Sequence, residues 1–149
     1  MMSTNSSDVH DDDVLELVHA VMHQVRSRQY RVLRDGPHDI THMDGKVLGY
    51  FGRHAGATQS DLAQHSGRDK AQLARLVKGL RDRGLLAGAA DADDRRNLRL
   101  TLTPAGVALQ AQLQQQAQQV ARQAMAGLDA EERAQLVALL QRVQANLGR

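Results

Sequence analysis

A run of alternating apolar and polar side chains constrains the fold of this chain more than any other feature. Residues 98–102 read Leu-Arg-Leu-Thr-Leu, and this period of two is typical of a half-buried strand. A second short apolar run covers 85–90, and the acidic stretch between the two runs indicates a turn. The pattern therefore predicts a β-hairpin with Arg95 and Arg96 near its tip. Such a ribbon fits a nucleic-acid groove, although a solvated hairpin with ordinary surface arginines fits the same pattern.

Apolar side chains at helical spacing flank this hairpin on both sides. They predict helices over 12–34, 41–54, 58–65, 69–83, 104–126 and from about 130 to 147. Thr58 and Asp61 have the spacing of a capping box, and Gly67 permits a sharp turn after them, so residues 58–83 are interpreted as a helix-turn-helix. The first and last two helices carry more apolar surface than a small central domain can cover. We therefore expect them to pair with a second copy of the chain.

Length and composition exclude several classes of protein. The 149 residues suffice for one domain with its own core. The absence of cysteine excludes disulfides, cysteine-based zinc sites and thiol redox chemistry. No apolar run approaches the roughly 20 residues of a transmembrane helix, and the acidic N-terminal residues are unlike a signal peptide, so we expect a cytoplasmic protein with no membrane partner. Three aromatic residues are too few for base stacking on single-stranded nucleic acid.

Basic charge is concentrated in the middle of the chain. Residues 41–104 contain eleven Lys and Arg against seven Asp and Glu, a net charge of +4. Residues 1–40 contain four against seven, a net charge of −3, and residues 105–149 contain four against three, a net charge of +1. This distribution favours an anionic partner that contacts the central part of the chain.

The chain resembles the MarR family of bacterial transcription factors, the multiple-antibiotic-resistance regulators, in three segments: TQSDLAQHSG at 58–67, LARLVKGLRDRGLL at 73–86 and DDRRNLRLTLTPAG at 93–106. The resemblance covers about 12–147. It implies a mainly α fold with a small β-hairpin wing, that is, a winged helix-turn-helix with N- and C-terminal dimerisation helices. The expected organisation is a disordered tail over 1–11, a dimerisation helix over 12–40, a DNA-binding lobe over 41–104 and dimerisation helices over 105–149. Most members of the family are homodimeric repressors that bind near-palindromic operators and release them when an effector binds.

The second helix of the helix-turn-helix is the expected reader of double-stranded DNA. With its apolar residues inward, helical spacing turns Gln72, Arg75 and Lys78 outward. Gln pairs bidentately with adenine and Arg with guanine in the major groove. Arg68 and Lys70 are expected at phosphates, which contribute affinity without sequence information. Arg68 departs from the family, because the residue after the turn glycine is usually apolar, and its contact is therefore less well defined.

The wing and the start of the helix-turn-helix supply the remaining expected DNA contacts. Asp94-x-Arg96 matches the family's Asp-x-Arg, which implies that Arg96 reaches the minor groove while Asp94 holds it by charge-assisted hydrogen bonds. Arg95 is a second expected contact of the wing. Thr58 and Ser60, at a helix N-terminus, are expected to present hydroxyls and amides to phosphate.

The effector is less well defined by the sequence. In this family, small aromatic acids or phenols often bind between the dimerisation region and the DNA-binding lobe. The candidate polar residues near that position are His19, His23, Arg26, His42, Lys46 and Tyr50. His19 with His23, and His38 with His42, also have the i, i+4 spacing of a two-histidine metal face. Without cysteine or a fixed carboxylate as third ligand, we expect neither a metal nor a cofactor.

Three other functions are alternatives to the repressor. An enzyme has no support, because the chain contains no nucleophile–base spacing, phosphate loop or carboxylate constellation. An architectural or interaction module with a winged helix but no effector response is opposed by the outward basic face of 68–78. A transcriptional activator uses the same residues, and the sequence does not separate it from a repressor.

Overall fold

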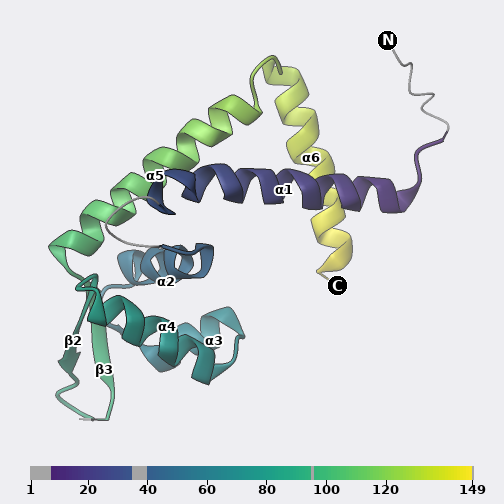
Figure 1. Cartoon of the computed structure of the whole chain (residues 1–149). Helices are drawn as coiled ribbons and strands as arrows, with labels where there is room; N and C mark the ends of the chain where they lie inside the picture. The colour runs from purple at the N-terminus through teal and green to yellow at the C-terminus, as the bar shows by residue number, and fades with distance from the viewer. Residues whose placement is uncertain (1–7, 35–39, 95, 149) are drawn as a thin grey trace.

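The computed structural model of the chain describes residues 8–34, 40–94 and 96–148. Over these residues the elements follow one another as α1 (Asp11–Arg34), α2 (His42–Arg53), β1 (Ala57–Thr58), α3 (Gln59–Ser66), α4 (Lys70–Asp82), β2 (Leu86–Ala90), β3 (Leu98–Leu102), α5 (Pro104–Ala124) and α6 (Ala130–Leu147). The predicted fold class, mainly helical with a small β wing, is confirmed (Figure 1). His38, Arg95 and residues 1–7 of the expected tail lie outside the described residues.

The sheet has one strand more than the sequence predicts. The expected hairpin forms from β2 and β3, and β1 adds to the outer side of β3, so the antiparallel order is β1-β3-β2. Two residues are too few to show a period, which is why β1 was not predicted. The alternation in β3 buries less than expected: Leu100 is 1% exposed but Leu98 is 36% exposed. The apolar face of the hairpin is therefore covered at its base and open toward its tip.

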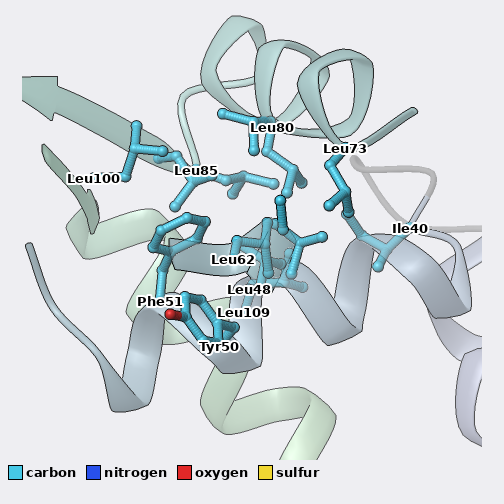
Figure 2. Packing of buried hydrophobic residues seen from close by; sticks show 14 residues of the cluster. Ile40, Leu48, Tyr50, Phe51, Leu62, Leu73, Leu80, Leu85, Leu100 and Leu109 are labelled. Carbon is cyan, nitrogen blue, oxygen red and sulfur yellow. The ribbon is translucent and has the colours of Figure 1, made fainter. Parts of the chain in front are cut away.

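The buried core lies in the central lobe, where α2, α3 and α4 pack on the sheet and on the start of α5 (Figures 1 and 2). Its largest fully buried side chains are Phe51, Ile40, Leu48, Leu73, Leu80, Leu85, Leu100 and Val47. Helical spacing predicted five of them, Val47, Leu48, Phe51, Leu73 and Leu80. It also turned Leu76 inward, and this residue is only half-buried. The lobe therefore has a core of its own.

Two helical glycines allow close approaches that fix the lobe against its neighbours. A Cβ at Gly45 of α2 would collide with the hydroxyl of Tyr30 on α1, and a Cβ at Gly106 of α5 would collide with the carbonyl oxygen of Leu85. Gly45 thus marks a close approach of α2 to α1. Gly67 has the positive φ of 65° that its place after α3 requires.

The outer helices differ from the lobe in having little to pack against. Helix α5 extends away from the lobe with α1 lying across it, and α6 folds back from the far end of α5 (Figure 1). No residue of α6 is buried. Large apolar side chains are exposed on both α1 and α6: Val14, Leu15, Leu17, Val18, Val21, Met22, Leu136, Val137, Leu139, Leu140, Val143 and Leu147. Within the described part of the chain, no helix combines the length and apolarity needed to cross a membrane.

Candidate nucleic-acid interface

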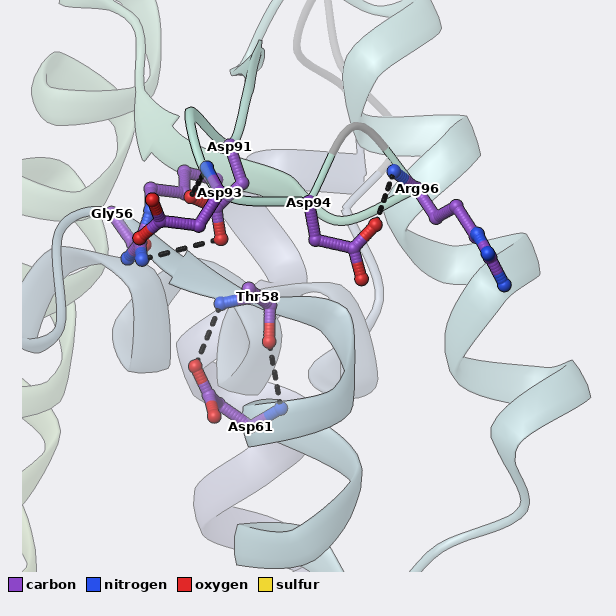
Figure 3. A network of polar contacts seen from close by, with 8 residues as sticks. Gly56, Thr58, Asp61, Asp91, Asp93, Asp94 and Arg96 are labelled. Carbon is purple, nitrogen blue, oxygen red and sulfur yellow. Dashed lines mark hydrogen bonds and ion pairs between the residues drawn. The ribbon is translucent and has the colours of Figure 1, made fainter.

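The helix-turn-helix begins with the predicted capping box. The Thr58 N–H donates to Asp61 Oδ2 at 2.9 Å, and the Asp61 N–H donates to Thr58 Oγ1 at 3.2 Å (Figure 3). The backbone N–H of Thr58, and then its hydroxyl, lower the pKa of the Asp61 carboxyl because hydrogen bonding to the carboxylate favours its charged form. The Thr58 oxygen is thus already an acceptor, whereas Ser60 is exposed on the first turn of α3. The box fixes where α3 starts relative to the sheet.

Helix α4 turns its polar side chains to solvent as the sequence predicts. Asp69 caps the helix by accepting from the Ala71 N–H at 2.9 Å. The buried side of α4 is formed by apolar residues of the core, and Gln72, Arg75 and Lys78 are exposed on the other side. The N-cap and the core contacts together set the rotation of α4. The three side chains therefore form one accessible polar face.

Arg68 and Lys70 lie on either side of the Asp69 cap. Lys70 is the first residue of α4 and is exposed. Arg68 precedes the helix, and its backbone N–H donates to Ser66 Oγ at 3.3 Å. Its side chain lines a cavity toward α2, so this residue borders both the turn of the helix-turn-helix and the interior of the lobe.

The structure gives Asp94 a different contact from the one that the resemblance implies. Asp94 Oδ1 accepts from the backbone N–H of Arg96 at 3.0 Å, and the Arg96 side chain extends away from that carboxylate (Figure 3). The Asp94 carbonyl also accepts from the Asn97 N–H at 3.0 Å. Asp94 therefore shapes the turn at the tip of the wing, because a short Asp side chain bonds readily to the backbone two residues on. The Arg96 guanidinium is left exposed.

Sequence reasoning missed Arg99, which ties the wing to the lobe. Its Nη1 donates to the Gly56 carbonyl oxygen at 3.1 Å, and its Nη2 lies 3.4 Å from Asp91 Oδ2. Arg99 thus bridges the loop before β1 and the end of β2. The one sequence signal that could have indicated Arg99 is its position on the polar side of the alternating strand. What it contacts follows only from the pairing of β1 with β3.

Five of the six candidate effector residues line two separate cavities, and the sixth lines neither. A cavity of about 440 Å³ between α1 and α2 includes His23, Arg26 and His42 in its lining. A second of about 440 Å³, bordered by α2, α3, the start of α4 and α5, includes Lys46 and Tyr50. His19 is exposed on α1 and lines neither cavity.

His42 is the most unusual group of the α1–α2 cavity. Both of its ring nitrogens are buried without a hydrogen-bond partner, and Tyr30 meets its ring edge-on at a centroid distance of 5.8 Å. Burial lowers the pKa of His42, and the neighbouring positive charges of Arg26, Lys46 and Arg68 lower it further. The imidazole is therefore held neutral at a position where it has unused hydrogen-bonding capacity.

The second cavity, called the α2–α4 cavity below, has a basic lining around one aromatic ring. Its charged or titratable members are Lys46, Arg53, His65 and Arg68, with Tyr50 among them. None of the described Asp or Glu residues lines it, and burial raises the pKa of the Tyr50 phenol. The Tyr50 ring lies 5.1 Å from that of His65 between centroids. The chemistry of this lining suits an anion that carries an apolar or aromatic body.

Of the two histidine pairs at metal spacing, only His19 with His23 lies wholly within the described residues, because His38 does not. Among the described residues, no group of three or more His, Asp or Glu side chains is arranged to hold a metal ion. His19 and His23 are both exposed on α1.

Comparison with known proteins points to one family. The model of the MarR family matches residues 38–97, which run from just before α2 to the tip of the wing. A protein of Thauera aromatica that is named as a transcriptional regulator for the hcr operon is 29% identical over 144 residues, covering 89% of this chain and 87% of that protein.

Solved structures share the fold over nearly the whole chain. A mutant of MarR from E. coli, crystallised with operator DNA, is 28% identical and superposes with a TM-score of 0.71 over 86% of this chain and 91% of that chain. FabT of Streptococcus pneumoniae, in complex with DNA, superposes with a TM-score of 0.83 over 93% of this chain and 98% of that chain. At 16% identity, FabT shows likeness of fold only. The matched family and the Thauera relative are transcriptional regulators and not enzymes.

Proposed function

We propose that the chain is a homodimeric transcriptional repressor of the cytoplasm that binds a near-palindromic operator in double-stranded DNA. In this proposal it leaves the operator when a small aromatic acid or phenol binds. The match of the MarR family model to the winged-helix segment, residues 38–97, supports the proposal. The observation that carries the proposal is the exposed polar face of α4, formed by Gln72, Arg75 and Lys78, beside a wing whose tip presents Arg96. The E. coli relative with the same fold was crystallised with operator DNA.

The groove contacts follow from the shape of the lobe. Helix α4 enters the major groove, where Gln72 and Arg75 meet base edges and Lys70 and Lys78 meet phosphates. The exposed guanidinium of Arg96 enters the adjacent minor groove, whose negative potential is greatest where A·T pairs narrow it. Thr58, Ser60 and Arg68 contribute phosphate contacts from the start and the turn of the helix-turn-helix, and Arg95 adds a second contact from the wing.

Dimerisation is supported by the apolar side chains exposed on α1 and α6. Leu139 and Leu140 of α6 are 55% and 43% exposed, and Leu17 of α1 is 66% exposed. Such contiguous apolar faces mark an interaction surface in a protein outside membranes. A second copy of the chain buries α1 and α6 symmetrically and places two α4 helices for the two halves of a near-palindrome.

We place the effector in the α2–α4 cavity. Its basic lining neutralises a carboxylate or phenolate, and its apolar members, among them Val47, Leu62 and Leu73, surround a ring. Arg68 and Leu73 belong to the turn and the first turn of the DNA-reading helix, so an occupant of the cavity directly contacts the residues that position α4. The α1–α2 cavity is the second candidate, because the neutral His42 there has unsatisfied nitrogens.

The two cavities are distinguished by matched variants. With salicylate as the probe, Lys46→Gln and Arg53→Gln are expected to raise the concentration that releases DNA, whereas Arg26→Gln and His42→Gln leave it unchanged. The measurement is fluorescence anisotropy of labelled operator DNA, with calorimetric titration of salicylate in the absence of DNA. The reverse pattern moves the effector to the α1–α2 cavity, and release by no aromatic acid or phenol removes the effector response from the proposal.

A footprint on the DNA upstream of its own gene tests the main proposal. We expect a protected site of two half-sites about one helical turn apart, lost on adding the effector. Arg96→Ala is expected to weaken operator binding by about 1–3 kcal/mol with the dimer intact, and Arg122→Ala on the outer helix α5 is the matched control. Equal affinity for operator and random duplex at one salt concentration assigns a non-specific architectural module instead. Increased transcription from the bound promoter assigns an activator.

A further inference from the structure

A small cavity lies between the DNA-reading helix and the wing and is lined by two arginines from different elements. Its volume is about 210 Å³, and Arg81 of α4 and Arg96 of the wing face it together with Ser60 of α3. The remaining lining residues are Gln59, Val77, Asn97, Leu98 and Leu100. Among the described residues, no acidic side chain lines it. Two permanent positive charges in one small cavity suit it to an anion.

Arg81 is positioned by a glycine on the neighbouring strand. A Cβ built at Gly88 of β2 would lie 3.4 Å from Arg81 Cζ and Nη2 and 3.5 Å from Nε. The guanidinium therefore rests against the strand in the space that a side chain would otherwise fill. Gly88 pairs with Leu100 at the centre of the hairpin. The backbone of β2 therefore sets how closely the Arg81 guanidinium approaches the hairpin.

Arg81 forms no ion pair with any other residue that the structure describes. Over the described residues the ion pairs join Arg83 to Asp44 and Arg99 to Asp91, and Arg81 takes part in neither. Its side chain is exposed. An arginine that lies against backbone and has no carboxylate partner keeps its forked donors available for an external ligand.

We propose that this cavity binds one backbone phosphate of the DNA duplex, with Arg81 as a direct phosphate contact and Gly88 as the residue that positions it. The inference rests on the proposed DNA-binding function. If α4 lies in the major groove and the wing tip in the adjacent minor groove, the sugar-phosphate strand that separates the grooves passes between them, where this cavity lies. Guanidinium groups bind phosphate oxygens bidentately, and such a contact fixes the register of the protein without reading a base.

The test is the salt dependence of operator binding by Arg81→Gln. The substitution removes one phosphate contact from each half of the proposed dimer, so it is expected to lower affinity roughly five- to tenfold per half-site and to reduce the slope of log K against log salt by about 0.9 per contact. The preference for operator over random duplex stays the same, because the contact carries no sequence information. Arg122→Gln on α5 removes the same charge away from the lobe and is expected to change neither the affinity nor the slope appreciably.

Gly88 provides a second, independent variant. Gly88→Val displaces the Arg81 guanidinium without removing it, so it is expected to weaken binding in the wild-type background and to have no further effect when combined with Arg81→Gln. A slope for Arg81→Gln equal to that of Arg122→Gln overturns the inference. So does a lowered melting temperature with an unchanged slope, which assigns Arg81 to wing packing. Wild-type protein that binds no DNA overturns the proposed function as well, whereas these other outcomes leave it standing.

Discussion

The central lobe and the outer helices have the same regular spacing of apolar residues, but the lobe buries these side chains and the outer helices expose them. In the lobe, Phe51 and Leu80 are fully buried by neighbours from the same chain. On α6, Leu139 and Leu140 follow an equally regular helical spacing and are exposed. A helix derives most of its stability from packing of its apolar face. The difference indicates that the lobe is stabilised by its own core, whereas α1 and α6 leave apolar faces open for the association that we propose.

The largest expected effect is loss of the core of the lobe. Phe51→Ala removes a fully buried aromatic side chain and is expected to lower the free energy of unfolding by about 3–5 kcal/mol. Val107→Ala, at a 56% exposed apolar position on α5, is the control and should cost well under 1 kcal/mol. Chemical denaturation followed by circular dichroism measures both. Similar losses for the two variants contradict a core confined to the lobe.

Charge on α6 is expected to break association while leaving the lobe folded. Leu139→Asp combined with Leu140→Asp places two carboxylates in the apolar face that we assign to the dimer, and burying an unpaired charge is strongly unfavourable. Sedimentation should show a monomer at concentrations where the wild type is a dimer. Gln141→Asp combined with Gln144→Asp adds the same charge to the same helix. If the leucine variant sediments like this control, α1 and α6 are not the interface.

The Gly45–Tyr30 approach tests how the two regions are coupled. Gly45→Ala improves helix propensity by about 1 kcal/mol, but its Cβ collides with the Tyr30 hydroxyl, and overpacking costs about 1–3 kcal/mol. We expect a net destabilisation near 1 kcal/mol that Tyr30→Phe partly relieves. Gly49→Ala is the matched control, since the contacts of its Cβ are with the ends of the flexible Arg53 and Gln110 side chains. A Gly45→Ala variant as stable as Gly49→Ala shows that α1 moves freely on α2.

The cap of α3 should have a smaller effect, confined to the lobe. Thr58→Ala removes the acceptor of the Asp61 N–H bond and is expected to cost about 1 kcal/mol. Thr58→Ser keeps the hydroxyl and should restore most of that loss. Thermal unfolding of the two variants measures the difference. Equal stability of the alanine and serine variants means that the capping bond contributes nothing.

Features of the lobe that depend on neighbouring residues in the sequence were predicted well. Features that depend on tertiary contacts were not predicted. The Thr58–Asp61 cap and the Gly67 turn depend on residues within a few positions of one another, so their patterns suffice. Strand β1 exists only because β3 pairs with it, and two residues show no period. The contacts of Arg99 with Gly56 and Asp91 depend on the same pairing.

The site residues show the same limit. Helical spacing correctly turned Gln72 and Arg75 outward, because the inward residues of α4 are apolar. It did not separate His42 from Lys46, which lie on one helix but line different cavities. Which cavity a side chain of α2 borders depends on the elements packed against each side of the helix, and spacing along one helix contains no information on that.

His42 is expected to give the smallest effect, a pH dependence that originates where the two regions meet. Burial lowers the pKa of His42. At a pH just below about 6.5, the ordinary pKa of histidine, the folded chain therefore keeps His42 neutral while the unfolded chain binds a proton there. Stability should therefore fall as the pH drops from about 6.5 toward the lowered pKa. His42→Gln should flatten this dependence and the exposed His10→Gln should not, as judged from melting temperatures between pH 8 and pH 5. The positive charges of Arg26 on α1, Lys46 on α2 and Arg68 before α4 add to this lowering of the His42 pKa. A pH dependence that is equally steep in wild type and His42→Gln contradicts a neutral His42.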